Sequence, residues 1–377
     1  MSLIVTHPFT LVVTVAKIFG LLSAKTPSKT NWRLFLYSLV LVVLYVAILV
    51  LRFLGNQEKT EQSLSKVVTY LHVLCYVAVF SANICSNWFN SKSFIRGLIR
   101  LEFFDYQIKP AVEIDYNNMK KRFYASFGVF WVIFFVVATV DFVGEIVLAK
   151  LDLITWISFY FPFFYNSFGL FIIYSTLFLV SERFSCLEAI LIKILREESL
   201  LDLKQFTLLF LELNEICNSM VANFSLQIAT TFLMVFVIVT TNLYLMLKMH
   251  LNTIQFVLNV NFFLVHFGQI VLIIFVFYSV NKKIREIVSL SPRIFSVNGK
   301  TKTSLKEQIE CYFLMKENRA HLSVLGMFHL DPSVLLSMGA SIVSYLIILI
   351  QFTDNMPNLS KPRHDGGTGS MRSSVNR

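Results

Sequence analysis

The chain has 377 residues, of which 56% are hydrophobic and only 15% are charged, and phenylalanine alone occurs 38 times. A soluble domain is about a quarter charged and less than half apolar, so this composition excludes an ordinary soluble protein and indicates one integral membrane domain. The formal charge of +10 is typical of basic cytoplasmic loops, and no soluble module is present that would present a basic face to nucleic acid.

Residues 1–33 are predicted to form a cytoplasmic segment that contains a short helix in the membrane interface. The apolar stretch from Pro8 to Ala24 is interrupted by Lys17, and no basic n-region precedes it. These features argue against a signal peptide and favour an interfacial helix.

Seven segments are long and apolar enough to cross a membrane, which requires about 20 residues in a helix. They cover residues 34–54, 67–89, 123–148, 153–180, 226–247, 257–280 and 333–352. The chain is therefore predicted to be an all-α, polytopic membrane protein with a seven-span domain at residues 34–352. The remaining residues, 353–377, are rich in Gly, Ser, Pro and charge and are expected to form a disordered extracellular tail with a glycosylation sequon at Asn358.

The orientation follows from the basic residues. Segments that share a side with the N-terminus hold 24 of the 33 Lys and Arg residues. Because positive loops stay in the cytoplasm, the N-terminus is expected inside the cell and the C-terminus outside.

The cytoplasmic connections carry apolar residues at helical spacing, so the spans are expected to continue as helices into a cytosolic assembly region. The stripes would be buried against one another or against a neighbouring subunit. The two stripes are Leu187, Ile190, Leu191, Ile194 and Leu195, and Phe206, Leu209, Leu213, Ile216 and Met220.

Further helices are predicted around Leu305, Ile309 and Tyr312, and from Asp331-Pro332, where Asp would cap the helix and Pro would occupy its first turn.

Several function classes fit this pattern poorly. A G-protein-coupled receptor would keep its C-terminus inside and carry Asp-Arg-Tyr after the third span, whereas this chain is expected to have its C-terminus outside and lacks that motif. A transporter would show internal repeats, and none is visible. The sequence has no phosphate-binding loop, nucleophile elbow, or CxxC or CxxH pair. We therefore expect no catalytic residue, metal or cofactor.

The last apolar segment carries a motif, Ser344-Tyr345, then five apolar residues at 346–350, then Gln351-Phe352. It resembles the C-terminal signature of insect gustatory receptors, Thr-Tyr, five mostly apolar residues and Gln-Phe. The sugar-receptor branch typically has Glu after the Tyr, where this chain has Leu346, which favours a bitter-type or unassigned tastant. The resemblance implies a tastant-gated, non-selective cation channel in the plasma membrane, built as a homo- or hetero-tetramer of related subunits. The alternative is a seven-span receptor or transporter without a pore of its own.

The resemblance also implies that the last span lines the pore. Small polar residues recur along one face of that span at spacings of 4, 3, 4 and 3, although ordinary helix packing would also place small residues there. That face holds Ser337, Ser341, Ser344, Ile348 and Gln351. The predicted pore and gate residues are Ser344, Ile348, Gln351 and Phe352.

Polar and aromatic residues lie in the outer halves of several spans, where the family has its ligand pocket. Aromatic walls with a few polar groups suit a small-molecule site. Each residue has a structural alternative, as an interfacial anchor or as a core residue with its hydrogen bonds satisfied. The predicted ligand-binding group is Tyr76, Asp141, Tyr160, Asn261 and His266.

Overall fold

The computed structural model is almost entirely helical in the residues that it describes. These are Thr14, Lys17 and residues 32–55, 63–148, 152–196, 201–248, 253–296, 304–318 and 322–355. Thr14 and Lys17 are helical, but the rest of the predicted interfacial helix lies outside the described residues, as do Asn358 and the tail beyond Asn355.

Seven of the helices are long and apolar enough to span a membrane, which confirms the predicted all-α, seven-span fold. Two short strands and an extramembrane helix separate the sixth span from the seventh. The elements in chain order are α2 (Trp32–Gly55), α3 (Ser63–Ile108), α4 (Tyr116–Phe142), the π-helix η1 (Val143–Leu148), α5 (Leu153–Leu195), α6 (Leu203–Lys248), α7 (Thr253–Leu290), the 3-10 helix η2 (Ser291–Ser296), α8 (Leu305–Glu317), β1 (Ser323–Val324), β2 (Phe328–His329) and α9 (Pro332–Asn355).

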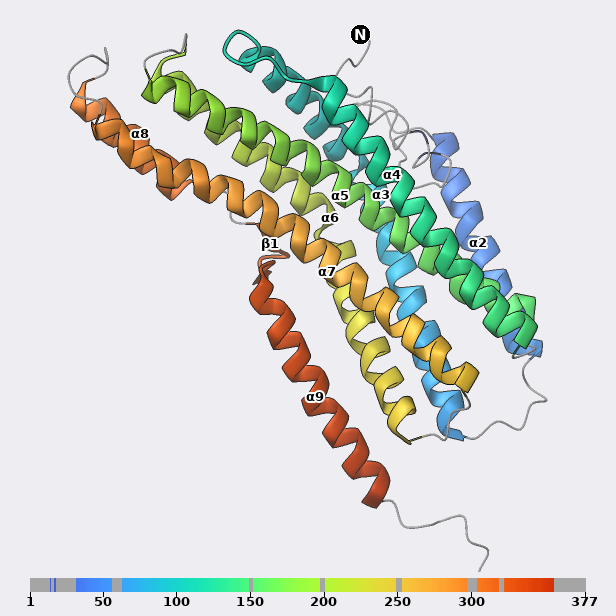
Figure 1. Cartoon of the computed structure of the whole chain (residues 1–377). Coiled ribbons are helices and arrows are strands. Elements are labelled where there is room, and N and C mark those ends of the chain that lie inside the picture. The colour runs from blue at the N-terminus through green and yellow to red at the C-terminus, as the bar shows by residue number, and fades with distance from the viewer. Residues whose placement is uncertain are drawn as a thin grey trace, which may run out of the picture.

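The long helices form a bundle around α5, whose side chains are mostly buried, whereas α2, α4 and α9 are largely exposed and suited to lipid or to other subunits. Helix α9 diverges from the bundle, and its C-terminal end lies at the opposite end of the molecule from the start of α2 and from α8 (Figure 1).

The helices continue well beyond a bilayer. Helices α3 and α6 have 46 residues each, about 70 Å of helix, which is more than twice the thickness of the hydrocarbon core. The stripe from Phe206 to Met220 is buried, and Leu187, Ile190 and Leu191 are buried on α5. The predicted helical extensions are thus confirmed, and their apolar stripes pack against one another within the chain.

A buried ion pair holds three helices together in this extension. Arg183 on α5 donates from Nη2 to Asp105 on α3 at 2.7 Å and from Nε to the other carboxylate oxygen at 3.0 Å. The Tyr116 hydroxyl, at the start of α4, also donates to Asp105 at 3.1 Å. Because both charged side chains are almost fully buried, this geometry satisfies charges that would otherwise be costly to bury.

The β1–β2 hairpin leads directly into α9. Its turn contains Leu325 and Gly326, with φ angles of 51° and 70°, and the Met327 N–H donates to the Val324 carbonyl at 2.9 Å, as in a type I′ turn. The predicted cap is confirmed, because Asp331 accepts a hydrogen bond from the Ser333 N–H at 2.9 Å. The Ser333 hydroxyl also donates to this carboxylate, and these bonds lower the pKa of Asp331.

Candidate functional site: a closed aromatic cavity at one end of the bundle

All five residues of the predicted ligand-binding group come together where α4 ends and where α3, α5 and α7 begin. Tyr76 comes from α3, Asp141 from α4 and Tyr160 from α5, whereas Asn261 and His266 lie on successive turns of α7. They form two hydrogen-bonded sets, one centred on Asp141 and the other on His266.

Asp141 is buried and accepts one hydrogen bond at each carboxylate oxygen. The Tyr160 hydroxyl donates to Oδ2, and Asn261 Nδ2 donates to Oδ1 at 2.6 Å. The helix widens into η1 immediately afterwards, and Gly144 in η1 lies so close to Leu258 on α7 that a methyl group there would overlap the leucine side chain. This close approach of η1 to α7 brings Asp141 within reach of Asn261. Such π-helical turns are frequent at functional sites.

His266 is fully enclosed and links α7 to α3. Its Nδ1 lies 2.8 Å from the Phe262 carbonyl, which only accepts, so Nδ1 carries a proton and donates. In the neutral ring, Nε2 then accepts from the Tyr76 hydroxyl at 2.9 Å. The chain thereby fixes the tautomer of His266 without a charged partner.

Four of these five residues line a cavity of about 10 Å³, which has room for about one water molecule and which we name the closed aromatic cavity. The fifth, Asn261, is not among the lining residues and is linked to the cavity through its hydrogen bond to Asp141. Sequence reasoning missed the three phenylalanines that complete its walls. Phe163 and Phe262 lie one helical turn from predicted residues, so helical spacing was the available signal. The cavity is lined by Tyr76, Asp141, Phe159, Tyr160, Phe163, Phe262, Val265 and His266.

Arg52 on α2 also supports this cavity and was not predicted from the sequence. Its guanidinium lies 4.2 Å from the centre of the Phe159 ring and donates to the Ser158 hydroxyl at 3.0 Å. The available signal was an arginine at the end of an apolar span, which is costly there unless it has partners. By this contact, Arg52 fastens α2 to the cavity wall.

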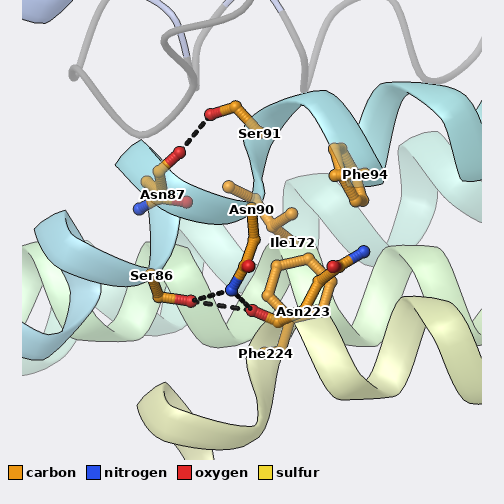
Figure 2. Close-up of a pocket in the computed structure, with 8 residues that line it drawn as sticks. All are labelled: Ser86, Asn87, Asn90, Ser91, Phe94, Ile172, Asn223 and Phe224. Atoms are coloured by element: carbon orange, nitrogen blue, oxygen red, sulfur yellow. Dashed lines mark hydrogen bonds between the residues drawn. The ribbon is translucent and has the colours of Figure 1, made fainter. Parts of the chain in front are cut away.

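A second, polar cavity lies farther along α3, between α3, α5 and α6 (Figure 2). The Ser86 hydroxyl and Asn90 Nδ2 both donate to the Asn223 backbone carbonyl, at 2.7 and 2.9 Å. The Asn223 side-chain amide points towards Phe94 (Figure 2), and its buried Nδ2 has no hydrogen-bond partner in the described part of the chain. The cavity volume of about 10 Å³ fits a bridging water.

The predicted pore residues lie on α9 and contact little of their own chain. Ser344, Ile348 and Gln351 are all exposed, and the Ser344 hydroxyl donates to the Ala340 carbonyl at 2.9 Å. Phe352 lies within α9, but its side chain is outside the described part of the structure.

A bundle of seven apolar spans with a small aromatic cavity between them is the architecture of a polytopic membrane protein. The sequence matches the 7tm Chemosensory receptor family over residues 9–356, and the chain belongs to this family. It is accordingly a multi-pass protein of the plasma membrane. The predicted resemblance to chemoreceptors is confirmed at the level of this family, and the gustatory assignment stays a prediction.

Two solved structures of the insect olfactory receptor OR5 from Machilis hrabei share the fold. One gives a TM-score of 0.62 at 14% identity, and the other, in complex with eugenol, gives 0.64 at 13%. Each alignment covers 91% of this chain and 97% of the OR5 chain. No curated protein sequence matches this chain.

Proposed function

We propose that the protein is a gustatory-type receptor that acts as a ligand-gated, non-selective cation channel, with four subunits around a pore lined by α9. The observation that carries this proposal is the exposed polar face of α9. Only one side of that helix packs on its own chain, for example where Tyr345 meets Phe236 edge to face at 5.5 Å. The opposite side carries Ser344 and, at its end, the exposed amide of Gln351.

An exposed amide is costly in lipid but is easily hydrated in a pore. Serine hydroxyls alone would not decide the matter, because Ser341 and Ser344 donate to carbonyls one turn back on α9. The exposed amide of Gln351 has two N–H donors and a carbonyl acceptor, which water in a pore can satisfy and lipid cannot. Four copies of Gln351 and Phe352 around an axis would form a narrow constriction between Ile348 and the C-terminal end of α9. Spreading of the four helices would open this constriction.

Helix α8 supports the assembly. Its buried face consists of Gln308, Cys311 and Met315, whereas Leu305, Ile309 and Phe313 are exposed at a spacing of four residues. We name these last three residues the α8 stripe. An apolar stripe on an extramembrane helix indicates a partner surface, here a neighbouring subunit.

We place the ligand in the closed aromatic cavity, with Tyr76, Asp141, Tyr160, Asn261 and His266 as its polar contacts. The eugenol complex of OR5 supports binding of a small molecule by this fold. The Ser344-Tyr345 and Gln351-Phe352 pairs favour a tastant, and the basic residues favour a cytoplasmic N-terminus with an extracellular α9 end.

Cysteine labelling tests the pore and the orientation together. A membrane-impermeant thiol reagent, added outside intact cells, should label Gln351→Cys above the wild-type background of native cysteines. It should not label the control Val343→Cys, because Val343 is exposed on a face of α9 away from the serines. Failure to label Gln351→Cys would remove the basis of the proposal.

Expression of the chain alone in oocytes separates the channel from a receptor or transporter without a pore. A tastant found by screening should evoke a cation current that Gln351→Cys loses on treatment with the same reagent. A tastant that binds the purified protein but evokes no current would favour the alternative class.

A further inference from the structure

The wall of the closed aromatic cavity contains a carboxyl group that has no cationic partner among the described residues. Asp141 is 5% exposed, and it belongs to none of the ion pairs found among the described residues. Glu145, one turn later in η1, and Arg52, which lies against the Phe159 ring, are not among the lining residues. Asp141 is therefore the one carboxyl group among the residues that line the cavity.

The hydrogen-bond donors of the cavity are already engaged. Tyr160 and Asn261 donate to Asp141, Tyr76 donates to His266, and His266 donates to a backbone carbonyl. An anionic ligand would meet the Asp141 carboxylate and no free donor among the residues that line the cavity, since Asn261, whose amide has a second N–H, lies outside that lining. A carboxylate oxygen that accepts one hydrogen bond retains capacity for another, so a ligand that donates can still bind Asp141.

The remaining walls favour a cation as well as an apolar body. Phe163 and Phe262 both lie against His266, with ring centroids 5.4 and 4.2 Å away, and Phe159 packs edge to face on Tyr76 at 5.7 Å. Aromatic faces carry negative electrostatic potential and attract ammonium groups, most strongly where water is excluded.

From these observations we infer that the ligand of this receptor is a compact protonated amine with an apolar body, whose ammonium group binds Asp141 between the aromatic rings. The inference rests on the proposed function, because it names the ligand of the same cavity. Binding requires the rings to move apart, since the cavity of about 10 Å³ is smaller than any such ligand.

The test uses three probes of nearly equal shape and different charge: 2-phenylethylamine, 2-phenylethanol and phenylacetate. Each is titrated into the purified full-length protein in detergent at neutral pH, and apparent affinity is read from the shift in thermal unfolding midpoint. The amine should bind at least about tenfold more tightly than the alcohol, as expected for a desolvated charge pair, and phenylacetate should bind most weakly.

Two variants assign the preference to the carboxylate. Asp141→Asn should reduce amine affinity about tenfold and leave that of the alcohol within about twofold, whereas Asp141→Glu should keep the preference for the amine. If Asp141→Asn does not fold, the wild-type comparison and Asp141→Glu decide. An amine that binds no more tightly than the alcohol, or a preference that survives Asp141→Asn, overturns the inference.

The readout is independent of conduction, so the two proposals fail differently. Tight amine binding without any evoked current would leave the inference in place and remove the channel. A current evoked by neutral tastants, together with no preference for the amine, would support the channel and overturn the inference.

Discussion

At the scale of single residues, the centre of the bundle depends on a glycine that lets polar side chains meet between α3, α5 and α6. Asn166 on α5 accepts from Asn83 Nδ2 at 3.3 Å and from the Thr231 hydroxyl at 3.0 Å. Gly169, one turn further along α5, leaves space for the amide of Gln227 and lies close to the side-chain oxygen Oδ1 of Asn83. In the absence of a side chain there, three helices approach closely enough to share one polar network.

We predict that Gly169→Ala destabilises the protein by about 1–3 kcal/mol, because the new methyl group would overlap the Gln227 amide in a packed interior. The control is Gly128→Ala on α4, where a Cβ would meet nothing within 4 Å. There the helix propensity of alanine should raise stability by up to about 1 kcal/mol. Thermal unfolding of the two variants in detergent measures the difference, and equal midpoints would contradict the assigned role of Gly169.

At the scale of elements, the ion pair of Asp105 with Arg183 fixes where α3, α4 and α5 meet beyond the membrane. Removing one partner leaves a buried charge without compensation, so Asp105→Asn should cost about 3–5 kcal/mol. The surface pair of Arg122 and Glu182, at 2.8 Å, provides the control, and Glu182→Gln should change stability by less than about 1 kcal/mol.

A double variant separates the two contributions of this ion pair. Asp105→Leu combined with Arg183→Met replaces both charges by apolar side chains of similar reach and should recover most of the stability that Asp105→Asn loses. Chemical denaturation of the purified proteins would show the recovery. A double variant as unstable as the single one would mean that the pair itself, and not its unbalanced charge, is essential.

The elements also show which features can be predicted from sequence. The spans, their helical extensions and the Asp331 cap follow from local signals, namely apolar length, a period of 3.6 and capping chemistry. The partners of Asp105 and Asp141 do not, because both depend on contacts between residues far apart in the chain. The π-helix at 143–148 was missed for the same reason, since it accommodates the close contact of Gly144 with α7.

In the candidate site, too, some residues could be predicted from local sequence signals and others could not. Tyr76, Asp141 and His266 were predicted because polar groups in apolar spans are costly without partners, and in the structure they lie along one cavity. The phenylalanines of that cavity were not predicted, because the chain contains 38 of them and helical spacing alone does not distinguish those in the walls from those facing lipid. The assignment of Tyr76, Asp141 and His266 as ligand contacts stays a prediction.

At the scale of the whole molecule, two features remain without a partner in the described part of the chain. One is the polar face of α9, and the other is the α8 stripe, which lies beyond the membrane towards the opposite end of the molecule from the end of α9 (Figure 1). A tetramer would cover both, with α8 near the contacts between subunits and α9 around the axis. The long helices between them would then carry a rearrangement of the closed aromatic cavity towards the pore.

The α8 stripe gives the sharpest test of this arrangement. Ile309→Gln with Phe313→Gln keeps helix propensity and removes two exposed apolar side chains, so the folded chain should persist while the proposed tetramer dissociates. Lys306→Gln, at an exposed polar position of the same helix, should leave the assembly intact. Light scattering on the detergent-purified proteins would report the masses. If the stripe variant remained tetrameric, α8 would not be the assembly surface, and a monomeric wild type would leave the polar face of α9 without an axis to line.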